Sequence, residues 1–196
     1  MILGDTCTRS CGFCNVKTGK PAPPDYDEPK KVGKSVSLME LRHIVVTCVD
    51  RDDLPDGGAA IWAETIAEVH AQAPNTTVEA LIGDFQGNEQ DLRTVIESQP
   101  EILAHNLETV PRMHSAVRPQ ATYDRSMQVL TRIQDSGLVS KTGIMVGIGE
   151  TDEEVLVMLA DIRKKSKTEI ITIGQYLQPS RNHLPIDRWV HPDQFA

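Results

Sequence analysis

The chain has 196 residues, of which 39% are hydrophobic and 24% are charged, values typical of one globular domain. Its formal net charge of -8, from 20 basic and 28 acidic side chains, disfavours a general attraction to nucleic acid or to an anionic membrane. No apolar run approaches the roughly 20 residues that span a bilayer, and no signal peptide is recognisable. We therefore expect a soluble intracellular protein with protein or small-molecule partners.

The first distinctive feature along the chain is a close group of three cysteines, Cys7, Cys11 and Cys14. Thiolates spaced in this way can hold three corners of a cubane iron-sulfur cluster and leave the fourth iron open for chemistry. Closely spaced cysteines also form structural zinc sites, for which Cys48 or one of six scattered histidines would supply the fourth ligand. The spacing favours the cluster and leaves zinc as the alternative. Cys48 lies in an apolar run and is interpreted as a small buried residue, not a ligand.

A proline-rich segment, residues 20–25, follows the cysteines and predicts a loop. Beyond it, short apolar runs alternate with amphipathic ones. The apolar runs predict strands buried on both faces, at residues 43–49, 77–82, 102–106, 143–146 and 169–173. The amphipathic runs predict helices at residues 58–71, 88–98, 123–135 and 151–165, the last with a capping box between Thr151 and Glu154.

Alternating strands and helices, at about 30 residues per unit, predict a parallel α/β fold with right-handed crossovers. Residues 1–3 count as the remnant of a truncated first strand, which gives six strands in one domain over residues 1–196. A closed barrel needs eight, so the length favours a partial (β/α)6 TIM-like barrel or an open sheet. In either case ligands bind at the carboxyl ends of the strands, where polar residues follow each predicted strand.

The cysteine loop resembles the CxxxCxxC signature of radical S-adenosylmethionine (SAM) enzymes, with Phe13 as the aromatic residue before the last cysteine. Longer stretches, at residues 3–9, 49–54, 105–112, 147–151 and 174–179, are similar to lipoyl synthases. The resemblance covers the whole chain. It implies that Cys7, Cys11 and Cys14 hold a 4Fe-4S cluster whose open iron binds SAM. The resulting 5′-deoxyadenosyl radical takes hydrogen from an octanoyl chain carried on a lysine, and sulfur is inserted at carbons six and eight to form the lipoyl cofactor.

The resemblance also implies further cofactor-binding residues. Asp56, Gly57 and Gly58 resemble a turn whose backbone binds the methionine amino group, with a plain helix-entry turn as the alternative. Asn106 and Glu108 are two residues apart, so both point to one side, towards the ribose or methionine of the cofactor. Further candidates are Ile144 and Gly147 near the adenine, Phe13 as a cover, and Arg112 and Arg125 for a carboxylate. For Ile144 the alternative is a core residue, and for the arginines a solvated surface.

The implied partners are an octanoylated lipoyl domain of a 2-oxoacid dehydrogenase or glycine-cleavage H protein, and an electron donor such as ferredoxin or flavodoxin. The cytoplasm is the expected compartment, or mitochondria or plastids in a eukaryote. Two lysine groups, at residues 30–34 and 164–167, are candidates for docking an acidic partner, but such charge runs favour solvated helix faces.

Full-length lipoyl synthases also bind a second, auxiliary 4Fe-4S cluster, through an N-terminal cysteine triplet and a C-terminal serine. Neither is found in this chain. We therefore expect a radical SAM core that is incomplete at both ends and carries the radical-generating half of the reaction. The alternatives are a radical SAM enzyme or pseudoenzyme of other chemistry, and a zinc-binding interaction module.

Overall fold

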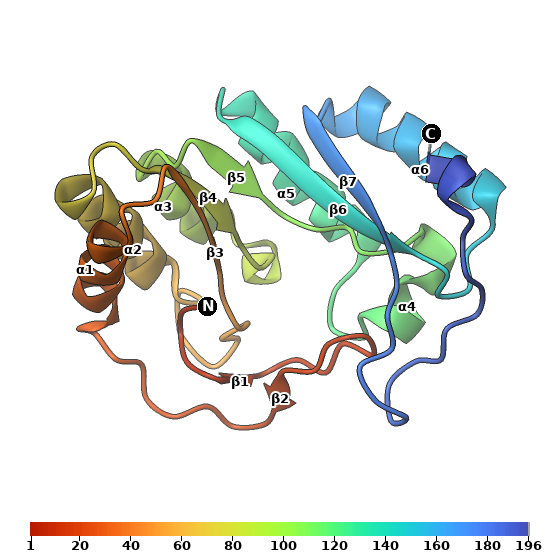
Figure 1. Ribbon diagram of the computed structural model, residues 1–196, viewed down its shortest axis with the longest axis horizontal. Helices are drawn as coiled ribbons and strands as arrows, with labels where there is room; N and C mark the ends of the chain where they lie inside the picture. The colour runs from red at the N-terminus through yellow and green to blue at the C-terminus, as the bar shows by residue number, and fades with distance from the viewer. Residues whose placement is uncertain (196) are drawn as a thin grey trace.

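The computed structural model describes residues 1–195 and centres on a curved parallel sheet in the order β3-β4-β5-β6-β7 (Figure 1). The strands lie in chain order, so each connection moves one place along the sheet in the same direction. This arrangement is a barrel that is open on one side, as predicted. The strands are β3 (His43–Thr47), β4 (Thr77–Leu81), β5 (Ile102–Ala104), β6 (Val139–Val146) and β7 (Ile170–Gln175).

The predicted first strand is present only as a single parallel bridge beside β3. Ile2 pairs with Cys48, its N–H donates to the carbonyl of Thr47 at 2.8 Å, and its own carbonyl accepts from the N–H of Val49 at 3.4 Å. Ile2 and Leu3 are nevertheless fully buried, at 1% and 2% exposure. The chain therefore enters the barrel at the expected place, but with too few residues to form a ladder.

Helices cover the outer face of the sheet, and four of them lie where the sequence predicts. Thr151 and Glu154 form both hydrogen bonds of the expected capping box. The helix predicted over residues 151–165 ends in one turn of π-helix, Ile162–Ser166. No helix within residues 1–195 is long and apolar enough to cross a membrane. The four helices are α2 (Ala59–Gln72), α3 (Glu89–Glu97), α5 (Tyr123–Asp135) and α6 (Asp152–Asp161).

Two helices were not predicted, α1 (Glu28–Met39) and the single turn α4 (His114–Val117). Lysine, serine and glycine dilute the apolar pattern of α1, whose buried residues are Pro29, Gly33 and Val36. It packs against α2 because Gly33 has no side chain: a Cβ there would lie 2.8 Å from the carbonyl oxygen of Glu68. The lysines of α1 are exposed, as expected for a solvated face.

The prediction that the strands are buried on both faces is wrong for the edges of the sheet. Along β3, Ile44 and Val46 are buried beneath the helices, whereas Val45 on the concave face is 56% exposed. Most of β7 is also exposed or half-buried. In a closed barrel, side chains from all strands fill the interior, but the open barrel leaves its edge strands without facing partners. The concave face therefore stays accessible to a ligand.

Candidate active site at the cysteine loop

The cysteine loop lies across the carboxyl ends of the strands (Figure 1). It runs between two short parallel strands, β1 (Thr6–Cys7) and β2 (Lys17–Thr18). Backbone hydrogen bonds fix it to the body of the fold: the N–H of Thr8 donates to Asp50 at 3.1 Å, and the N–H of Gly12 donates to Val117 at 2.9 Å. The loop is thus held both by the segment after β3 and by α4.

The three cysteines line one cavity of about 320 Å³, between the loop and the ends of β3, β4 and β5. Phe13, Asn106 and Glu108, which the sequence assigns to the cofactor, line the same cavity. The prediction that Asn106 and Glu108 point to one side agrees with this placement. Further polar or sulfur-bearing residues that line it include Arg9, Cys48, Asp50, His105 and Arg118.

Arg9 is the buried anchor of the loop and is only 2% exposed. Its Nε and Nη2 donate to the two carboxylate oxygens of Asp52, both at 2.8 Å, and Nη2 also donates to Oδ1 of Asp84 at 2.6 Å. Burial raises the pKa of Asp84, but the hydrogen bond and charge of Arg9 outweigh it and lower that pKa to about 2. The charged network ties the loop to the ends of two strands.

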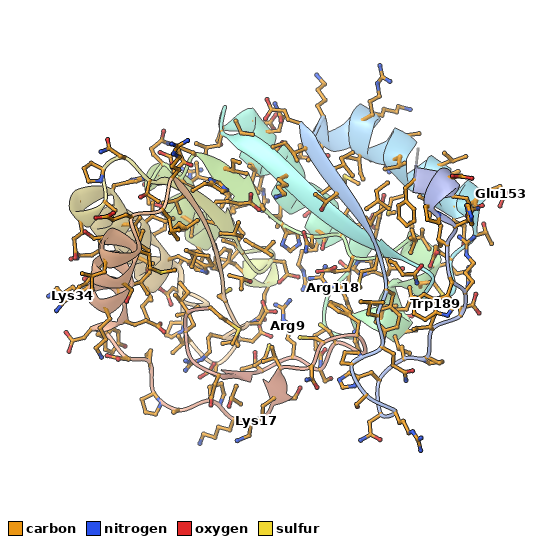
Figure 2. The ribbon with its side chains drawn as sticks, in the orientation of Figure 1. Arg9, Lys17, Lys34, Arg118, Glu153 and Trp189 are labelled. Carbon is orange, nitrogen blue, oxygen red and sulfur yellow. The ribbon has the colours of Figure 1, made fainter. Side chains whose placement is uncertain are left out.

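A second buried arginine, Arg118, also lines the cavity, and Figure 2 labels it together with Arg9 near the centre of the molecule. Its Nη1 donates to the carbonyl oxygen of Asn106 at 2.7 Å, which fixes the chain where β5 turns towards the cavity. Burial, reinforced by the positive charge of Arg118, lowers the pKa of His105 to about 4. His105 is therefore neutral at pH 7, hydrogen-bonded to the carbonyl of Ile82 and the hydroxyl of Ser126.

The cysteine thiols suit a bound metal cluster. In the metal-free chain, burial raises the pKa of Cys7 and raises that of Cys11 to about 11, while the charge of Arg118 opposes the shift at Cys11. Metal ligation requires the thiolate, so cluster binding would release these protons. Among residues 1–195, no three Cys, His, Asp or Glu side chains have the spacing of a single-ion site. A cubane cluster needs separated thiolates instead, because each one binds a different iron.

The cavity also contains an unsatisfied donor, Nη1 of Arg9. This nitrogen is buried and has no hydrogen-bond acceptor within residues 1–195, and the carboxylate of Asp50 lies 3.7 Å away. Burial keeps the pKa of the Asp50 carboxyl above its ordinary value, although Arg9 opposes this shift. Burial likewise raises the pKa of Glu108. A buried donor and half-buried carboxyls beside soft thiol ligands fit a polar cofactor bound next to an iron-sulfur cluster.

The glycine turn lies outside this main cavity. Asp56 caps α2, its carboxylate accepting from the N–H groups of Gly58 at 2.9 Å and Ala60 at 3.0 Å. Gly57 and Gly58 both have positive φ, and Gly57 lines a small neighbouring cavity together with Cys48. The structure thus gives this turn a helix-capping role, and its contact with the methionine amino group stays a prediction.

Four other candidates also lie outside the residues that line the cavity. Ile144 is 3% exposed and lies in an apolar cluster with Leu107 and Met127. This placement matches the alternative of a core residue. Gly147 has φ +87° and begins the turn after β6. Arg112 pairs with Glu154 at the surface, and Arg125 pairs with Asp84 at 3.3 Å. Both arginines are therefore committed to other carboxylates.

Sequence reasoning missed the two arginines that do line the cavity. Arg9 lies between the first two cysteines, and that position is the one signal in the sequence that could have identified it. Arg118 comes from the irregular connection after α4, where no periodic pattern indicates which way a side chain points. Cys48 is near the cavity wall, where burial raises its pKa to about 12. Cys48 is half-buried and lines the cavity, so it is less deeply buried than predicted.

Comparison with known proteins agrees with this geometry. The family model of the radical SAM superfamily matches residues 1–162. The fold is similar to methylornithine synthase (PylB), with a TM-score of 0.72 at 14% identity over 96% of this chain and 55% of that one. It is also similar to Streptococcus suis SuiB bound to S-adenosylmethionine, with a TM-score of 0.70 at 11% identity over 94% and 42%. Fold and cysteine cavity together define a radical SAM protein.

The similarity in sequence is more specific. Lipoyl synthase of Christiangramia forsetii is 54% identical over 196 residues, which are 100% of this chain and 67% of that protein. Mitochondrial lipoyl synthase of Nematostella vectensis is 53% identical over 196 residues, with the same two coverages. The chain belongs to the lipoyl synthase family, which confirms the resemblance seen in the sequence. It spans about two thirds of the length of these relatives.

Proposed function

We propose that this chain carries the radical-generating site of a lipoyl synthase, with Cys7, Cys11 and Cys14 as the three ligands of a 4Fe-4S cluster. The observation that carries the proposal is that all three thiols line the cavity that also contains Asn106, Glu108 and two buried guanidinium groups. When bound, the cluster and SAM supply the 5′-deoxyadenosyl radical. This chain's own residues provide the ligands, the orientation of the cofactor and the exclusion of water.

Individual residues have distinct parts in this proposal. Arg9 holds the cysteine loop in place, because its guanidinium bonds to carboxylates at the ends of two strands. Phe13 covers the cavity from the loop side, where it packs against the same apolar cluster as Leu184 and Ile186. Asn106 and Glu108 present an amide and a carboxylate to the cofactor. Arg118 holds the backbone of this segment by its hydrogen bond to the carbonyl oxygen of Asn106. Asp56 to Gly58 and Gly147 remain candidates for contacts that form once the cofactor is bound.

The family acts on a protein-bound octanoyl chain, and we propose a lipoyl domain of a 2-oxoacid dehydrogenase or the glycine-cleavage H protein as its carrier. An electron donor of the ferredoxin or flavodoxin type would reduce the cluster. The inserted sulfur would come from an auxiliary cluster, for which this chain has no second cysteine triplet. We place the reaction in the bacterial cytoplasm or in a eukaryotic organelle.

Anaerobic reconstitution with iron and sulfide tests the proposal. The wild-type chain should bind about four irons, absorb near 400 nm as thiolate-bound iron does, and release 5′-deoxyadenosine from SAM on reduction. Cys11→Ser should lose most of the iron. Cys48→Ser is the matched control and should keep it, because Cys48 lies outside the loop that carries the three proposed ligands. A colourless wild-type protein that binds one zinc would refute the proposal.

A further inference from the structure

Residues 178–190, here called the strap, follow β7, fold back beside the cysteine loop and then return towards α6 (Figure 1). The two segments are about as far apart in the sequence as this chain allows. The backbone N–H of Leu184 donates to the carbonyl oxygen of Gly12 at 3.0 Å, and Nε2 of His183 lies 3.1 Å from the carbonyl oxygen of Cys14. The strap therefore contacts the backbone of the loop at Gly12 and at Cys14, one of the three proposed ligands.

The contacts of His183 fix both its tautomer and its ring orientation. A carbonyl oxygen only accepts hydrogen bonds, so Nε2 must carry a proton and donate to Cys14. In the neutral ring Nδ1 then accepts, and the hydroxyl of Ser180 lies 2.8 Å from it as the donor. The carbonyl of His183 also accepts from Nε2 of Gln178 at 3.0 Å. Both ring nitrogens of this half-buried side chain therefore have a partner.

Apolar packing holds the strap close to the loop. Leu184 and Ile186 of the strap and Phe13 of the loop pack against the same buried cluster, which contains Tyr176. The hydroxyl of Tyr176 donates to the carbonyl oxygen of Leu184 at 2.6 Å. Gly12 permits this approach, because a Cβ at this position would lie 2.8 Å from Cδ1 of Leu184. The strap and the loop are therefore matched in shape at the residue between the second and third cysteines.

The far end of the strap is anchored to the turn after β6. The N–H of Asp187 donates to the carbonyl of Gly147 at 2.9 Å, and Nη2 of Arg188 contacts Glu150 at 3.3 Å and Asp152 at 2.6 Å. Glu150 in turn accepts from the N–H of Gly147 at 2.7 Å. The strap thus connects the cysteine loop to the turn expected to lie near the adenine, and both of its ends are fixed.

From these contacts we propose that His183 is a positioning residue for the third cluster ligand. Its hydrogen bond fixes the carbonyl of Cys14 and so the direction in which the Cys14 thiolate points into the cavity. The inference rests on the proposed function, because the thiolate is positioned for the cluster proposed above. Outer partners of this kind orient metal ligands and influence the reduction potential of the cluster.

Four variants test the proposal on the whole chain. His183→Ala removes the donor, His183→Asn has a donor too short to reach Cys14, and His183→Gln places an amide N–H near the position of Nε2. Arg181→Ala is the matched control, since Arg181 is an exposed strap residue. Each reconstituted protein is treated with an iron chelator, the midpoint potential of its cluster is titrated, and hydrogen exchange over residues 11–17 is measured in the iron-free protein.

We expect the Ala and Asn variants to lose iron about tenfold faster than wild type, the upper range for one neutral hydrogen bond, with a shifted midpoint potential and faster exchange in the loop. The Gln variant should restore most of the wild-type behaviour, and Arg181→Ala should match wild type. Iron loss within twofold of wild type in the Ala variant, or a Gln variant no better than Ala, would overturn the proposal. If the wild type bound no cluster, the proposed function would fail, whereas exchange in the iron-free protein would still decide whether His183 orders the loop.

Discussion

Replacing Asp84 by Asn should destabilise the chain by about 2 kcal/mol at pH 7, because Asp84 is the carboxylate that Arg9 and Arg125 share. Its pKa is about 2 in the folded chain against an ordinary value of 3.8. Each pKa unit corresponds to about 1.4 kcal/mol, which gives the expected loss. Because the folded pKa is lowered, this stabilisation is present above pH 3.8 and disappears as the pH falls towards 2.

Urea unfolding of the iron-free wild type and variant, followed by circular dichroism at pH 7, 5 and 3, measures this directly. The difference in unfolding free energy should stay near 2 kcal/mol at pH 7 and 5, and fall to about half at pH 3. Asp124→Asn is the control, because this exposed carboxylate should contribute less than about 0.5 kcal/mol. Equal stability of wild type and Asp84→Asn at pH 7, or a difference that does not shrink in acid, would refute the role of the Arg9 network.

Thr151→Ala should lower the free energy of unfolding in urea by about 1 kcal/mol, because it removes the capping box of α6. The iron content should stay unchanged, and an unaltered urea midpoint would count against the cap. Gly147→Ala should lower the free energy of unfolding by about 2 kcal/mol, since φ is +87° and a Cβ would meet the carbonyl of Arg188. Limited proteolysis should then cut the strap of the variant, and a variant as resistant to the protease as wild type would contradict this packing. Lys141→Met should lower the free energy of unfolding by about 3 kcal/mol, because it leaves buried Glu79 without its main partner. Adding Glu79→Gln should recover part of that loss, and a double variant no more stable than Lys141→Met would show that the ion pair is not the cause.

Local patterns in the sequence were sufficient where one segment forms one element. The capping residue of α6 and the whole of α5 follow from side-chain periodicity and a cap, which depend on residues a few positions apart. Helix α1 escaped prediction because a glycine that packs against α2 stands where the pattern needs an apolar side chain. Gly33 contributes through its contact with α2, a helix far away in the sequence, and local periodicity carries no information on such a contact.

The candidate site divides in the same way. Cys7, Cys11 and Cys14 were evident because the three proposed cluster ligands lie on one short loop, so their spacing in the sequence already indicates the chemistry. Arg118 and His183 come from irregular segments, and each reaches the site through contacts with residues far away in the chain. Ile144 is buried in an apolar cluster, as its core alternative expects, and its contact with the cofactor stays a prediction.

The sequence alone determined the family, the half-open parallel barrel and the loop that carries the proposed cluster ligands, because motif spacing and periodicity are local properties. Only the tertiary structure decided which charged groups surround the thiols. It placed Arg9 between carboxylates from two strand ends, and it folded the strap back so that His183 meets Cys14. Those contacts depend on the path of the chain through space, since the energy that fixes a buried side chain comes from partners that are not neighbours in sequence.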